Sequence, residues 1–119
     1  MKWPVLAAAT LLAAQAAAET HVGFEARIDK DSNLIRISEF YAASRARGSG
    51  LGTGDVLVAI DRVQIKHPNT IHRYAKRKKP GEVVTITVNR NYRLVEKKVV
   101  LVDGDEARES GTLGYIGGR

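Results

Sequence analysis

The 119-residue chain contains no cysteine. No disulfide can therefore stabilise these residues, no thiol can act as a nucleophile, and no lipid-modified cysteine can anchor them. Aromatic side chains are also scarce, at 6% of the residues, and they are not interleaved with basic ones as on surfaces that stack nucleic-acid bases. The composition, with 44% hydrophobic and 27% charged residues, is that of one small domain whose stability comes from its core.

The first eighteen residues have a different composition from the rest. Lys2 supplies a positive charge, Val5 to Ala14 is an apolar run, and Ala16 to Ala18 are the small residues typical of a cleavage site. The apolar run is shorter than the ~18 residues that a membrane-spanning helix needs. We therefore expect 1–18 to be a signal peptide and the mature chain to be periplasmic or secreted; the alternative is an N-terminal core helix or membrane anchor.

The next segment has the pattern of a β-hairpin. Apolar and polar residues alternate toward the end of 22–28, turn-forming residues fill 29–33, and 34–37 predicts a second strand. Alanines and other helix-tolerant residues then predict a short helix over 38–46, with Ser38 as its N-cap.

Glycines separate this segment from a buried strand, which begins after Asp55. A longer helix follows at 69–78, where apolar residues recur at three- and four-residue spacing. β-Branched residues at 83–88 and apolar residues at 94–102 predict an antiparallel hairpin with a turn at 89–91.

The last segment, 103–119, begins with acidic and small residues and ends with several glycines. We expect a flexible tail. Within it, Thr112 to Ile116 could instead dock as a strand into a groove of its own chain or of a neighbour, giving autoinhibition or an oligomer.

The join between glycine-rich loop and strand carries a resemblance. Ser49-Gly50-Leu51, Gly52-Thr53 and Gly54-Asp55 precede the strand Val56 to Ile60 and the turn Asp61-Arg62, and Lys79-Pro80-Gly81-Glu82 opens a strand that ends at Arg90. In this order the segments resemble bacterial PDZ domains of high-temperature-requirement and tail-specific proteases. Ser49, Thr53 and Arg62 depart from the usual alanine, proline and glycine of that pattern.

The resemblance covers about 22–102 and implies a PDZ-like domain over 19–102. The expected fold is α+β, a small partly open β-barrel or sandwich of five to six strands with one long and one short helix. No strand precedes the loop at 20–24, so we expect a circular permutation in which 94–102 takes that strand's place.

The resemblance also implies a site. An extended peptide or protein C-terminus would add to a strand at 24–28, opposite the helix, with its carboxylate held by backbone N–H groups of the loop. The implied peptide-binding residues are His21, Val22, Gly23, Phe24, Glu25, Ala26, Ile71, Tyr74, Ala75 and Lys78. Phe24, Ile71 and Ala75 would line the pocket for the last side chain, or belong only to the core. His21 would tune carboxylate affinity with pH, or be solvated.

Basic residues cluster at the end of the longer helix, in a chain of net charge +6. The cluster consists of Arg73, Lys76, Arg77, Lys78 and Lys79. It predicts either a surface for anionic envelope material or a solvated helix end whose cations complement the helix dipole.

Catalysis has little support in the sequence. No serine lies in a nucleophile-elbow setting, and His21, His67 and His72 do not have a metal-ligand spacing. We expect neither enzymatic activity nor a cofactor, and no nucleic-acid partner. The leading hypothesis is an exported peptide-binding adaptor or regulator, possible partners being an envelope protease or a secretion component, and the alternative is a cationic binder of anionic surfaces.

Overall fold

The computed structural model describes residues 19–113, so the predicted signal peptide and the end of the predicted tail lie outside the described residues. Its elements run in the order β1 (Thr20–His21), β2 (Phe24–Ile28), β3 (Ile35–Phe40), η1 (Ala46–Gly48), β4 (Val56–Ile60), β5 (Val63–Gln64), α2 (Pro68–Ala75), β6 (Val83–Arg90), β7 (Arg93–Val100), β8 (Val102–Asp103) and α3 (Gly104–Ser110). No helix among these residues is long and apolar enough to cross a bilayer.

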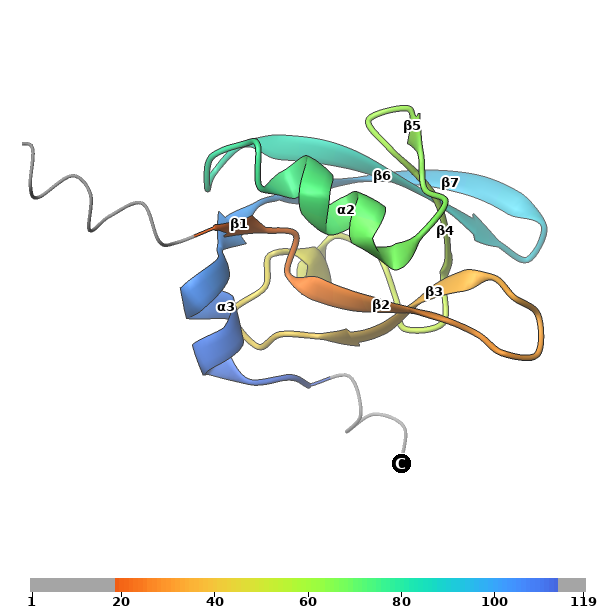
Figure 1. Cartoon of the computed structure of the whole chain (residues 1–119), viewed down its shortest axis with the longest axis horizontal. Helices are drawn as coiled ribbons and strands as arrows, with labels where there is room; N and C mark the ends of the chain where they lie inside the picture. Colours follow the sequence, from red (N-terminus) through yellow and green to blue (C-terminus); the bar gives the residue numbers. More distant parts are fainter. Residues whose placement is uncertain (1–18, 114–119) are drawn as a thin grey trace, which may run out of the picture.

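The strands form an antiparallel sheet in the order β2-β3-β4-β6-β7, with β5 folded back onto β4. A separate pair joins β1 to β8, so the start of the described chain lies beside the segment that precedes α3 (Figure 1). The predicted α+β fold is confirmed. The prediction that 94–102 supplies the strand beside the loop at 20–24 is wrong in its residues. Residues 93–100 form β7, which pairs with β6, and the strand that pairs with β1 is the short β8.

The core lies between the sheet and α2, which covers the opening between β2 and β6 (Figure 1). Alternation places Ile35 and Ile37 of β3 inward, and Val84, Ile86 and Val88 of β6 do the same. Helix α2 contributes Ile71 and Ala75, which are four residues apart on one face. Burial of these side chains is the main source of stability.

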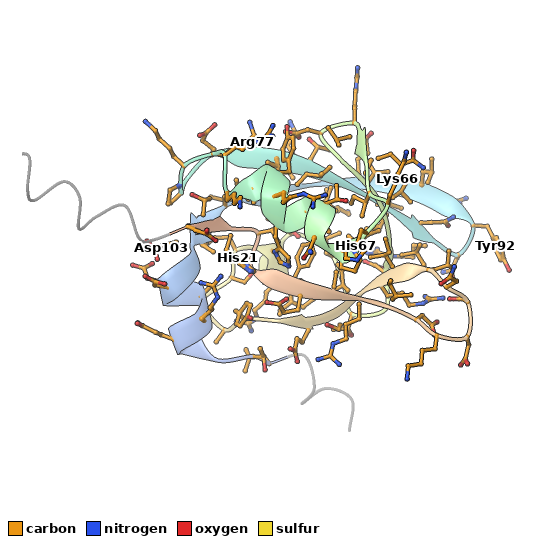
Figure 2. All side chains as sticks on the ribbon, in the orientation of Figure 1. His21, Lys66, His67, Arg77, Tyr92 and Asp103 are labelled. Atoms are coloured by element: carbon orange, nitrogen blue, oxygen red, sulfur yellow. The ribbon has the colours of Figure 1, made fainter. Side chains whose placement is uncertain are left out.

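Three local predictions are wrong. Ser38 does not cap a helix over 38–46: it lies within β3, its hydroxyl donates to the Glu25 carbonyl at 3.1 Å, and only the short 3₁₀ turn η1 follows. The predicted turn at 89–91 is misplaced: strand β6 continues to Arg90, as the motif after Lys79 predicted, and the turn to β7 lies at Asn91 and Tyr92, both with positive φ. Tyr92 projects fully exposed from the tip of this hairpin (Figure 2).

The third correction concerns the tail, because residues 104–110 form helix α3. Asp103 caps this helix by accepting hydrogen bonds from the backbone N–H groups of Asp105 and Glu106 at 2.8 and 3.1 Å. Ala107 is fully buried, and the backbone N–H of Gly104 donates to the Glu19 carbonyl at 2.6 Å. The segment at 103–110 is therefore part of the domain rather than a flexible extension.

After α3, the chain runs beside the end of β3. Thr112 forms a bridge with Tyr41, and the N–H of Leu113 donates to the Phe40 carbonyl at 2.7 Å. The predicted docking of 112–116 as a strand therefore has a counterpart at 112–113, but it is next to β3 and not in the groove beside β2. Residues 114–116 lie outside the described residues.

The glycine-rich loop before β4 is fixed by an ion pair. The Asp55 carboxylate accepts from Arg90 Nε and Nη2 at 3.0 and 2.7 Å and from the N–H of Gly52 at 2.8 Å. Burial raises the pKa of Asp55, but the hydrogen bonds from Arg90 and Gly52 outweigh it, so that the pKa is lowered overall. Arg90 Nη2 also donates to the Gly50 carbonyl at 2.8 Å.

We predict that Arg90→Ala lowers the free energy of unfolding by about 2 kcal/mol, because it leaves the nearly buried Asp55 carboxylate without its cation. Urea denaturation followed by circular dichroism measures this. Arg93→Ala is the control, since Arg93 is exposed; its cost should stay below about 0.5 kcal/mol. Equal losses of unfolding free energy in the two variants would contradict a stabilising role for the ion pair between Arg90 and Asp55.

Candidate functional site

Strand β2 has only β3 as a neighbour within the described sheet, so its other edge faces α2. The N–H of Tyr41 donates to the Gly23 carbonyl at 3.0 Å, which makes Phe24 and Phe40 a non-hydrogen-bonded pair. The N–H and C=O of Phe24 therefore point away from β3.

The same orientation holds at Ala26. Its partner Ile37 exchanges hydrogen bonds with Gly54 and Asp55 on the β4 side, at 2.8 and 3.0 Å, so the Ala26 backbone groups also point to the free edge. Phe24 is fully buried, whereas Ala26 is partly exposed. The accessible part of the free edge therefore begins at Ala26.

The predicted carboxylate loop, 21–24, is buried along its whole length. The Gly23 N–H already donates to His21 Nδ1 at 2.8 Å. Gly23 has φ +95°, and a Cβ there would collide with the Ser44 side chain. Glycine at this position is thus required by the backbone conformation and by Ser44.

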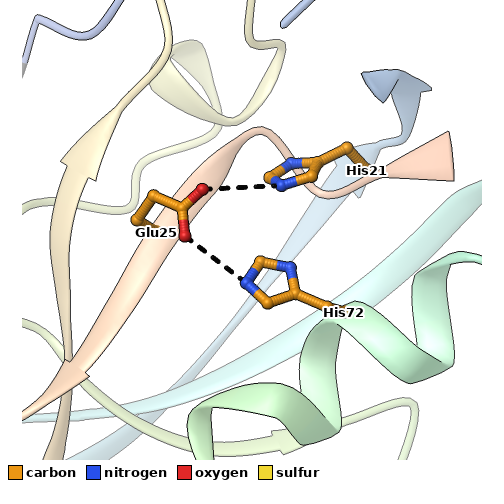
Figure 3. A group of neighbouring side chains, drawn as sticks. All are labelled: His21, Glu25 and His72. Carbon is orange, nitrogen blue, oxygen red and sulfur yellow. Dashed lines mark ion pairs between the residues drawn. The ribbon is translucent and has the colours of Figure 1, made fainter. Parts of the chain in front are cut away.

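The Glu25 carboxylate is the shared acceptor of the site, with oxygens directed at two histidines (Figure 3). His72 Nε2 on α2 lies 3.5 Å from Oε1, and His21 Nε2 lies 3.7 Å from Oε2. The Tyr41 hydroxyl donates to Oε2 at 2.5 Å. These contacts connect β2 to β1, to α2 and to the segment after β3.

The contacts shift several pKa values. The imidazole of His72 beside the carboxylate, together with the hydrogen bond from Tyr41, outweighs burial and lowers the pKa of Glu25 to about 2. Burial, followed by repulsion from His72, lowers the pKa of His21 to about 4. Burial and the bond to Glu25 raise the pKa of Tyr41 to about 12. At neutral pH the site therefore holds an ionised Glu25 and a neutral His21.

Ligand atoms of His21, Glu25 and His72 lie within 4.8 Å of one another. In this arrangement, however, the three side chains do not fit a metal ion. Because His21 Nδ1 accepts the Gly23 N–H, the proton of the neutral ring is on Nε2, which then has no lone pair to offer. His72 Nδ1 is buried without a hydrogen-bond partner, whereas a metal-bound histidine normally donates through its second nitrogen.

A cavity of about 210 Å³ opens next to this cluster. Its lining comes from β1 and the residue before it, β2, α2 and α3, and consists of Glu19, Thr20, His21, Glu25, His72 and Arg108. Besides the two imidazoles, the ionisable lining residues are two carboxylates, Glu19 and Glu25, and one guanidinium, Arg108.

The structure brings some of the predicted site residues together and separates others. Phe24, Ile71 and Ala75 meet, each at most 1% exposed, so they belong to the core. The Tyr74 hydroxyl donates to Asp61 at 2.7 Å, away from Glu25, and Lys78 Nζ lies 5.4 Å from the centre of the Tyr74 ring.

Five residues of the cavity region were not predicted as part of the peptide site: Glu19, Thr20, Tyr41, His72 and Arg108. His72 carried a usable signal, since it follows the inward-facing Ile71 on α2 and so lies next to the face that meets β2. Arg108 could not be placed without knowing that its segment folds back as α3.

Comparison with known proteins shows the family. The PDZ domain family matches residues 26–101, and the chain belongs to this family. A serine protease Do-like HtrA of Lactobacillus helveticus is 32% identical over 82 residues, which are 66% of this chain and 20% of that protein. The chain thus spans about a fifth of the length of this curated relative.

Solved structures show the same fold at lower identity. The HtrA-type protease AlgW with a decapeptide is 20% identical, with a TM-score of 0.67 over 84% of this chain and 35% of that one. AlgW with a tripeptide is 21% identical, with a TM-score of 0.65 over 72% of this chain and 32% of that one. An aminopeptidase N family protein from Idiomarina loihiensis is 24% identical, with a TM-score of 0.61 over 81% of this chain and 15% of that one.

The lowered pKa of His21 predicts an acid-sensitive fold. In the unfolded chain this histidine binds a proton near pH 6.5, whereas in the folded protein it does so near pH 4. Its contribution to the free energy of unfolding is therefore fully present above pH 6.5 and is lost as the pH falls to 4. The slope from this group is at most about 1.4 kcal/mol per pH unit. Urea denaturation between these pH values measures it.

His21→Asn removes the titrating ring and leaves an amide oxygen to accept the Gly23 N–H, so the slope should become shallower. His67→Asn is the matched control, because it removes an exposed imidazole and keeps a good N-cap for α2. A slope that is the same in wild type and His21→Asn would show that His21 does not carry the effect.

Proposed function

We propose that the protein binds an extended peptide segment that adds as a strand to the free edge of β2, next to α2. The observation that carries this proposal is the orientation of Ala26, whose N–H and C=O point to a partly exposed edge without a strand partner among the described residues. Such an edge is the ordinary template for strand addition, in which backbone hydrogen bonds give affinity and neighbouring pockets select side chains.

The relatives support a peptide ligand in general terms. AlgW was solved with a decapeptide and with a tripeptide, which is a property of that protein. Membership of the PDZ family brings the same class of ligand to this chain as a proposal. We further propose that the protein is exported, with 1–18 as its signal peptide, and that it acts as an adaptor or regulator without catalysis of its own.

Ala26→Pro tests the proposal directly, because it removes the N–H that faces the free edge and leaves the β3 side of β2 intact. We expect the affinity for a bound extended peptide to fall about tenfold, which corresponds to the loss of one good hydrogen bond. Isothermal titration calorimetry measures it, with circular dichroism to confirm folding. Ala26→Ser, which keeps the N–H, should bind like wild type. Equal affinity in Ala26→Pro and wild type would refute strand addition at β2.

The cationic alternative has an observation of its own. Arg73, Lys76, Arg77 and Lys79 are all exposed on α2 and the turn that follows it. Arg77 and His21 lie on opposite sides of α2 in Figure 2. Binding of anionic material at this cluster would therefore not compete with a peptide at β2.

The double variant Lys76→Glu and Arg77→Glu tests this second surface. If it binds anionic surfaces, retention on vesicles of anionic phospholipid should fall at least about tenfold at low salt, since each cation near such a surface contributes roughly 1 kcal/mol. Arg93→Glu with Lys98→Glu changes the net charge equally on β7 and should retain binding. Equal loss of binding in both double variants would show that retention depends on the net charge of the protein and not on this cluster.

A further inference from the structure

The loop at 21–24, where a ligand carboxylate was expected to bind, is unfavourable to a free carboxylate. The Gly23 N–H, which a ligand carboxylate would need, is already taken by His21 Nδ1 at 2.8 Å. Residues 21–24 are buried, so their other backbone groups are not offered to solvent. The Glu25 carboxylate faces the same space and would repel a second anion.

Glu25 retains capacity to bind a donor. A carboxylate has about four acceptor positions, and the contacts to Glu25 within the described residues are a short hydrogen bond from Tyr41, a longer approach by His72 and a still longer one by His21. Its side chain is 31% exposed and lines the cavity of about 210 Å³. A ligand donor can therefore reach it from solvent.

The charged side chains that line the cavity also favour a cationic ligand group. Glu19 and Glu25 face the single positive charge of Arg108, which also lies 3.8 Å from the Asp105 carboxylate. With His21 neutral, Arg108 is the one lining residue that always carries a positive charge, and it faces two carboxylates. A cationic group entering the cavity would find an unsatisfied negative charge.

We infer that this cavity is the specificity pocket of the groove and takes a cationic side chain, lysine or arginine, from an internal extended segment of the ligand rather than a free C-terminal carboxylate. This inference depends on the proposed function, since the peptide backbone is held by β2. It adds the chemical class of the ligand: a basic extended segment whose lysine or arginine lies opposite Glu25.

The test uses peptides of alternating valine and threonine, acetylated and amidated, with lysine, glutamine or glutamate at one central position. A fourth peptide carries glutamine and ends in a free carboxylate. Affinities are measured by calorimetry at pH 8, where an ordinary imidazole is neutral. We expect the lysine peptide to bind about 5 to 30 times more tightly than the glutamine peptide, and the free carboxylate to give no gain.

Glu25→Gln should abolish the preference for lysine over glutamine. Glu109→Gln is the matched control, because it removes the same charge from an exposed position on α3 outside the cavity, and it should keep the preference. Glu19→Gln, at the exposed rim, should reduce the preference in part. The peptide comparison on wild type stands even if Glu25→Gln folds poorly.

Tighter binding of the free-carboxylate peptide than of its amidated form would overturn this inference and leave strand addition intact. A lysine preference that survives in Glu25→Gln would overturn it as well. Failure of all four peptides to bind would overturn both the inference and the proposed function, so the two can be told apart.

Discussion

The Glu25 carboxylate connects the parts of the domain that define the groove. It lies on β2 and meets His21 from β1, His72 from α2 and Tyr41 from the segment after β3. A partly buried carboxylate is stable only if such partners replace its lost hydration. The position of α2 over β2 therefore follows from the electrostatics of one side chain as well as from burial of Ile71 and Ala75.

A second constraint follows from the loop before β2. Gly23 has a left-handed conformation and contacts Ser44, and its N–H is satisfied by its own neighbour His21. Because the Gly23 N–H is bonded to His21 and Phe24 is fully buried, the accessible part of the free edge begins at Ala26. The site thus consists of an exposed strand edge and an anionic cavity, and the apolar residues at its base serve the core.

The sequence predicted the sheet well because strand burial has a period of two residues, which is visible in β3 and β6 without tertiary information. It predicted the glycine-rich loop because its motif is local. The predicted helix over 38–46 was wrong because burial of Ile35, Ile37 and Phe40 in β3 overrides the helix propensity that begins at Ser38.

Long-range contacts explain the remaining differences. Helix α3 is short, polar on most of its surface and stabilised by contacts of Gly104 with Glu19, which no local pattern reveals. The cavity needs residues from β1, β2, α2 and α3, so its lining emerges only after folding. Burial of Phe24, Ile71 and Ala75 was one of two readings that the sequence left open, because core and pocket use the same apolar face.

Amide hydrogen exchange of the folded protein, resolved by residue with NMR, tests the central claim most directly. The account predicts that the Gly23 amide, bonded to His21 Nδ1 in a buried loop, is strongly protected, whereas the Ala26 amide on the free edge exchanges rapidly. Rapid exchange at Gly23 together with protection at Ala26 would contradict it, because the loop would then be open to a ligand and the edge of β2 already occupied.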